Sequence, residues 1–177
     1  METRTLLSGD GEAATCRKEA YMTGQEFASY VETQCGNSGK QYQAYMNLKP
    51  NDSWCAALIS TCAQRLGISS TLIPKATRCT QIRDLADSNS PLHEWIEQSS
   101  ARKPKPGDIA CIRWDSSSNP CNCVGVVTSY NSKDETVDIA IGDFGSTGSK
   151  NSKVRLVTYS DSLSCIQGYV RPDWSKA

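Results

Sequence analysis

The sequence predicts an α+β domain in which N-terminal helices pack on a small antiparallel sheet. Before Gly67, apolar residues recur at helical spacing, and beyond Pro106 they gather in short runs rich in β-branched residues. Those runs are separated by Gly, Asn, Ser and Asp, which favour turns. Helices first and strands afterwards are typical of α+β folds, where the two kinds of element segregate. A chain of 177 residues is long enough for one such domain.

The predicted domain covers residues 21–177 and follows a polar arm over residues 1–20. Its first helix is expected over residues 23–31. Thr23 is a suitable N-cap, and Glu26 three residues later completes the capping-box pattern. These two residues therefore indicate where the helix begins.

A second helix is predicted from an apolar repeat in the first half of the chain. The repeat follows helical spacing: Cys55, Leu58, Ile59, Cys62, Ala63 and Leu66. Asp52 and Ser53 provide start signals, and Gly67 is a natural stop because glycine tolerates the left-handed conformation that ends many helices. The pattern places Cys55 in the first turn of this helix.

The rest of the chain is expected to begin with loops and end with strands. Residues 69–105 should mix loops with short helix, including one helical turn over residues 92–96. Four or five antiparallel strands are expected after this stretch. The candidate strands are residues 109–112, 124–128, 137–141, 154–157 and 166–170.

A cysteine in the first turn of a helix has the electrostatic setting of a nucleophile. The helix N-terminus carries roughly half a positive charge and has free N–H groups, which favour the thiolate and stabilise an oxyanion. The alternative is that Cys55 belongs to the core, as Cys62 would further along the helix. Residue types alone leave the two interpretations open.

Several motifs resemble, in order, those of the CHAP family of cysteine, histidine-dependent amidohydrolases/peptidases, in particular its phage endolysin-like members. The main matching segments are Trp54-Cys55-Ala56-Ala57, Lys105-Pro106-Gly107-Asp108-Ile109, Val124-Gly125-Val126-Val127 and Ile166-Gln167-Gly168-Tyr169-Val170. The resemblance implies a papain-like fold, with Cys55 as nucleophile on a helix that packs against the sheet. It also implies peptidoglycan as substrate, cut at the N-acetylmuramoyl–L-alanine amide or inside the stem peptide and cross-bridge. Neither a cofactor nor a metal is implied.

The sequence departs from the family pattern at the general base. The family's histidine corresponds to Cys123, which directly precedes the Val-Gly-Val-Val motif. Cysteine has an ordinary pKa of about 8.5 and forms no cation, so it takes up and returns the protons of the reaction poorly. The family position that orients the histidine corresponds to Asp143, which could otherwise be a turn residue beside glycines.

Three alternatives concern the cysteines and the lone histidine. His93 could serve as the base, although a solvated surface position is the ordinary expectation for it. Cys55 and Cys123, expected to lie across one groove, could form a disulfide in an oxidising exterior. The same pair, with Cys121 and His93, could hold a soft metal such as zinc. The nine cysteines include no C-x-x-C pair, however, and most are expected to be reduced and buried.

Composition argues against several function classes. Basic and acidic residues balance at 19 each, which is unlike a dedicated nucleic-acid-binding protein. No apolar run reaches the roughly 18 residues of a membrane span. The first residues contain no apolar signal-peptide core. We therefore expect synthesis in the cytoplasm and action at the bacterial cell wall, after lysis or as part of a virion.

Two functions compete. One is a CHAP-like peptidoglycan hydrolase, an amidase or endopeptidase whose Cys55 nucleophile works weakly because the base is missing. The other is a catalytically inactive CHAP-like structural or wall-binding component, for example of a phage particle or tail. Its partners would be peptidoglycan and other virion or tail proteins. The family resemblance favours the first function, and the cysteine at position 123 favours the second.

Overall fold

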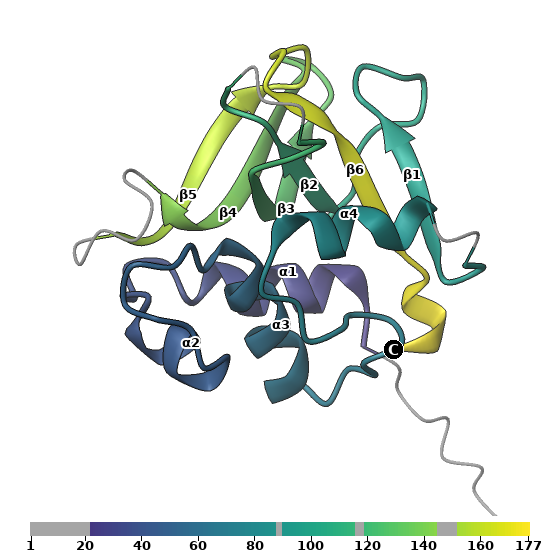
Figure 1. The fold of residues 1–177 in the computed structure, drawn as a ribbon. Coiled ribbons are helices and arrows are strands. Elements are labelled where there is room, and N and C mark those ends of the chain that lie inside the picture. Colours follow the sequence, from purple (N-terminus) through teal and green to yellow (C-terminus); the bar gives the residue numbers. More distant parts are fainter. Residues whose placement is uncertain (1–21, 88–89, 116–118, 145–151) are drawn as a thin grey trace, which may run out of the picture.

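A six-stranded antiparallel sheet with helices packed against it forms the described part of the chain (Figure 1). The computed structural model describes residues 22–87, 90–115, 119–144 and 152–177, so the expected arm over residues 1–20 lies outside the described residues. The helices are α1 (Gly24–Glu32), α2 (Lys40–Tyr45), α3 (Cys55–Arg65), α4 (Cys79–Asp87) and the 3-10 turn η1 (Trp174–Lys176). The strands are β1 (His93–Glu97), β2 (Ile109–Ile112), β3 (Cys123–Asn131), β4 (Thr136–Phe144), β5 (Lys153–Ser160) and β6 (Ile166–Pro172). Their order in the sheet is β1-β6-β2-β3-β4-β5, and this architecture confirms the predicted α+β class.

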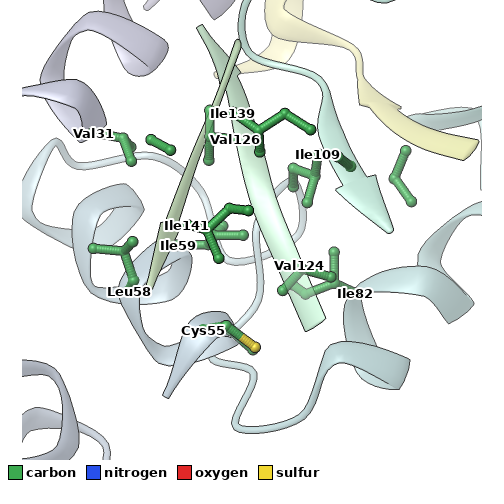
Figure 2. Close-up of a cluster of buried hydrophobic side chains, with 14 of the residues drawn as sticks. Val31, Cys55, Leu58, Ile59, Ile82, Ile109, Val124, Val126, Ile139 and Ile141 are labelled. Carbon is green, nitrogen blue, oxygen red and sulfur yellow. The ribbon is translucent and has the colours of Figure 1, made fainter. Parts of the chain in front are cut away.

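The core lies between the helices and the sheet. Helices α1 and α3 pack on β3, α3 also contacts β4, and α4 packs on β1 and β6. Fully buried side chains meet between the layers, among them Leu58, Ile59, Val126, Ile139 and Ile141 (Figure 2). Each such side chain contributes about 1.5–3 kcal/mol when it leaves water, so this packing holds α3 firmly against the sheet. None of the helices in the described ranges is long and apolar enough to cross a membrane.

Local sequence signals account for the ends of two helices. The Thr23 N–H donates to the Glu26 carboxylate at 2.8 Å, and the Glu26 N–H donates to the Thr23 hydroxyl at 3.2 Å, which confirms the capping box of α1. Gly67 has φ +72° just past the end of α3, as expected for a C-terminal stop. The start of α3 differs from expectation, because Trp54 is its N-cap and makes no capping hydrogen bond. The Asp52 carboxylate instead accepts a backbone N–H three residues upstream at 2.8 Å.

The strand prediction was correct in five places and wrong in one. All five predicted runs lie within strands β2 to β6. The helical turn expected over residues 92–96 is instead strand β1, which pairs antiparallel with β6. Ile96 is buried opposite Tyr169 of β6, so pairing with a distant strand outweighs the local preference there.

A buried ion pair connects β6 to the turn that leads into β2. Arg171 donates through Nε to Oδ1 of Asp108 at 2.9 Å and through Nη2 to Oδ2 at 2.7 Å. The same guanidinium donates to the Lys103 carbonyl at 2.9 Å, and the Asp108 carboxylate also accepts the Lys105 N–H at 2.8 Å. Asp108 is 1% exposed, so the charge of its carboxylate depends on these donors.

Candidate functional site

The Cys55 thiol lies at the first residue of α3, on the edge of the hydrophobic core (Figure 2). The residue is 3% exposed. The Ser53 hydroxyl lies 3.7 Å from its sulfur, and the backbone N–H groups of Ala56 and Val124 donate hydrogen bonds to it. Since Val124 belongs to β3, the helix and the sheet both supply donors. This environment stabilises a negative charge on the sulfur.

Cys123 begins strand β3 and lies opposite Ile112 of β2 in the sheet register. Its thiol donates to the Val124 carbonyl at 3.8 Å and lies close enough to the Cys55 thiol for each to shift the pKa of the other. The residue is 7% exposed, so the pair is largely shielded from water. The structure therefore brings the two predicted cysteines into contact, one at the start of the helix and one on the adjoining strand. Their chemical roles stay a prediction.

The pKa values of the two thiols shift in opposite directions. The hydrogen bond from Cys123, helped by the backbone and Ser53 donors, lowers the pKa of Cys55 to about 7, against the opposing effect of burial. The hydrogen bond to Cys55, together with burial, raises the pKa of Cys123 well above its ordinary value. Further along α3, burial raises the pKa of Cys62 to about 12. Near neutral pH the proton of the pair therefore rests on Cys123, and Cys55 supplies the thiolate.

Asp143 lies in β4, where the pairing with β5 shifts register between Ile141 and Phe144. Its φ is +58°, a left-handed conformation that aspartate tolerates better than most residues. The residue is 8% exposed, and its carboxylate is close enough to Cys123 to contribute to the raised pKa of that thiol. Asp143 is thus part of a bulged strand rather than of a separate turn, and all three predicted site residues lie in one region.

Trp54 connects the start of α3 to the end of β4. Its ring is 1% exposed, and its Nε1 donates to the Ser152 hydroxyl at 3.1 Å. A Cβ at Gly142 would lie 2.7 Å from the Trp54 ring, so the close packing requires glycine at that position. Because Trp54 precedes Cys55 and Gly142 precedes Asp143, this contact fixes the two site residues relative to each other. No local sequence pattern indicates this role of Trp54, because it depends on a contact between distant segments.

A pocket of about 390 Å³ gives access to Cys55. Its walls come from the start of α3 (Ser53 and Cys55), from residues 77–80 before and at the start of α4, and from residues 119, 121 and 122 before β3. Arg78 on this wall is exposed, and it has no ion-pair partner among the residues that the structure describes. None of the described residues that line this pocket has an acidic side chain. The pocket therefore presents a cation, hydroxyls and amides beside the thiol, and no sequence motif indicated Arg78.

His93 lies away from the thiol pair. It begins β1, and strands β6 and β2 separate β1 from β3 in the sheet. Its Nε2 donates to the Leu72 carbonyl at 2.7 Å, and the residue lines a different pocket. Over the described ranges, no group of three or more His, Cys, Asp or Glu side chains is arranged to hold a metal ion. The geometry thus supports neither His93 as the base nor the zinc alternative.

Among solved structures, the fold is similar to that of the wild-type endolysin LysIME-EF1 in its crystal structure. The TM-score is 0.58, and the match covers 85% of this chain and 64% of that chain at 15% sequence identity. This chain therefore spans less than two thirds of the length of the solved one. No protein-family model matches the sequence, and no curated protein matches it either. The similarity shows an endolysin-like α+β fold, whereas CHAP membership stays a prediction.

Proposed function

We propose that this chain is a CHAP-like peptidoglycan hydrolase, an amidase or endopeptidase with Cys55 as its nucleophile. The observation that carries the proposal is the position of the Cys55 thiol, which begins a helix, lines a pocket and receives hydrogen bonds from two elements. The fold similarity to a protein named an endolysin supports a cell-wall substrate. The hydrolase domain would comprise residues 21–177 and act at the bacterial wall, after lysis or as part of a virion.

The site is better equipped for nucleophilic attack than for proton transfer. The Cys55 thiolate would attack the amide carbonyl, and the oxyanion would form beside the N–H groups at the start of α3. The leaving amine must then take a proton as the C–N bond breaks. The Cys123 thiol is in contact with Cys55 but is a very weak acid because its pKa is raised. Amine departure is therefore slow, and we expect weak hydrolysis.

The charge of the pocket fits an anionic substrate. Among the described residues of its wall, Arg78 is the cation, and Thr77, Thr80 and Asn122 add uncharged hydrogen-bonding groups. Stem peptides of peptidoglycan carry free carboxylates, which guanidinium groups bind well. This chemistry supports a peptide portion of the wall as the part that enters the pocket.

The second candidate function is an inactive structural or wall-binding component of a virus particle or tail. The observation that favours it is the raised pKa of the Cys123 thiol, which keeps its proton near neutral pH and would stand where the family resemblance places a base. In that case the pocket would bind wall peptides without cutting them, and other virion or tail proteins would be the partners.

Hydrolysis of purified Gram-positive walls distinguishes the two functions. We expect the wild-type protein to lower wall turbidity slowly and to release new amino groups, and we expect Cys55→Ala to fall to the buffer background. Cys62→Ala is the matched control, because it removes a buried thiol from the same helix without touching the pocket. Robust activity that survives Cys55→Ala would reject Cys55 as the nucleophile. Wall binding without any release of amino groups would support the structural function.

A further inference from the structure

The two thiols of the site are arranged for chemistry other than hydrolysis. Cys55 and Cys123 are both free, one at the first residue of α3 and the other at the first residue of β3, and α3 packs on β3. A disulfide requires the two sulfurs to approach to about 2.05 Å, and the two side chains already interact in the folded protein. The pocket beside Cys55 is large enough to admit a small oxidant.

We propose that Cys55 and Cys123 are a reversible dithiol–disulfide pair, at which a small peroxide oxidises Cys55 and Cys123 then closes the disulfide. In the first step the Cys55 thiolate attacks a peroxide oxygen, the O–O bond breaks, and Cys55 sulfenic acid forms with release of hydroxide. In the second step the Cys123 sulfur attacks the Cys55 sulfur, the S–O bond breaks, and the hydroxyl leaves as water with the Cys123 proton. Two thiols and one hydrogen peroxide thus give one disulfide and two waters. The sulfurs together lose two electrons, and the peroxide gains them.

The surroundings of the pair determine the order of these steps. Thiolates react with peroxide and thiols do not, and Cys55 is the member whose pKa is lowered. Cys123 keeps its proton and lies beside Cys55. This is the position that a resolving cysteine must occupy. A low-pKa cysteine next to a resolving one is the usual arrangement of redox-sensitive thiols.

Neighbouring thiols in the same region provide an internal comparison. Cys79 donates its thiol proton to the Cys121 carbonyl at 3.0 Å, and the side chain of Cys121 makes hydrogen bonds with the thiols of Cys79 and Cys111. Hydrogen bonding within the group, with burial, raises the pKa of both Cys79 and Cys121. These thiols are therefore expected to be oxidised after the Cys55–Cys123 pair.

The proposal does not depend on peptidoglycan hydrolysis, because the pair would form in an inactive protein as well. Oxidation would nevertheless remove the free Cys55 thiolate, so a hydrolase would be switched off until a thiol reductant restored it.

The test is treatment of the fully reduced, full-length chain with one equivalent of hydrogen peroxide, followed by intact-mass and peptide mass spectrometry. We expect a mass loss of two hydrogens, a link between the peptides that contain Cys55 and Cys123, and reversal by dithiothreitol. Cys123→Ser should stop at Cys55 sulfenic acid, which dimedone traps, and Cys62→Ala, which removes a thiol of α3 outside the pocket, should form the disulfide as the wild type does. Cys123→Ala, checked by circular dichroism, repeats the test if the serine variant does not fold.

Two outcomes would overturn the proposal. One is a disulfide that persists in the Cys123 variants and is lost in Cys121→Ser, which would assign the resolving role to Cys121. The other is a folded wild-type protein in which Cys55 is oxidised to sulfinic acid without passing through a disulfide.

Discussion

Replacing Cys123 by histidine is expected to raise the rate of wall hydrolysis by about 10²–10⁴-fold. An imidazole titrates near neutral pH, so it takes the Cys55 proton and returns it to the leaving amine, which Cys123 does poorly. A gain of this size corresponds to about 2.7–5.4 kcal/mol of barrier. Asp143 already acts electrostatically on position 123 and would orient the new ring. The measurement is the initial rate of turbidity loss for wild-type and Cys123→His proteins on the same walls.

Two controls separate restored proton transfer from a general effect on the site. Cys123→Ser is of similar size but brings no base, so it should show no gain. Hydrolysis of p-nitrophenyl acetate should rise much less than wall hydrolysis in Cys123→His, because the phenolate leaves without a proton. A Cys123→His protein that folds, as judged by circular dichroism, and gains nothing on walls would contradict the assignment of position 123.

Arg171→Met is expected to lower the free energy of unfolding by about 3–5 kcal/mol. The substitution keeps an apolar chain of similar length but removes both guanidinium bonds to Asp108, a residue that is only 1% exposed and whose carboxylate keeps one backbone donor. An uncompensated buried charge is costly, so the connection between β6 and the start of β2 should weaken. Urea unfolding followed by circular dichroism measures the change.

Arg102→Met is the matched control, because Arg102 pairs with Glu94 and both side chains are about half exposed. An exposed ion pair of this kind contributes about 1 kcal/mol or less. Equal losses of stability in the two variants would contradict the argument that burial makes the Asp108 pair important.

Much of the fold could be predicted from local patterns in the sequence. The start of α1 could be predicted because Thr23 and Glu26 make the capping hydrogen bonds themselves. The end of α3 could be predicted because Gly67 adopts the left-handed conformation that ends the helix. Strand β1 could not be predicted in the same way, because its five residues become a strand through pairing with β6. Helix α2, with six residues, is too short to show a helical repeat.

The candidate site was predictable only in part. The position of Cys55 follows from the helix pattern, whereas Cys123 and Asp143 were identified through the family resemblance. The contact between the two thiols depends on α3 packing against β3, which no local pattern specifies. Their opposite pKa shifts arise from this contact, and Arg78 joins the pocket from a segment without a motif.

The rates of alkylation by iodoacetamide test whether Cys55 is an activated thiol. In the reduced, folded protein near neutral pH, we expect Cys55 to react faster than Cys35, although Cys35 is exposed. Partial burial and the Glu32 carboxylate raise the pKa of Cys35, so little of it is thiolate at that pH.

The pH dependence gives the same test a second readout. The Cys55 rate should rise through about pH 7 and then level off, because its lowered pKa completes thiolate formation early. The Cys35 rate should continue to rise at more alkaline pH, because its pKa is raised. Peptide mass spectrometry follows the alkylation of each cysteine separately. The denatured protein gives the reference rate of each cysteine in the absence of folded structure. We expect the order of reaction rates to be Cys55, then Cys35, then the buried Cys62. A folded, fully reduced protein in which Cys55 reacts no faster than Cys62 would contradict it.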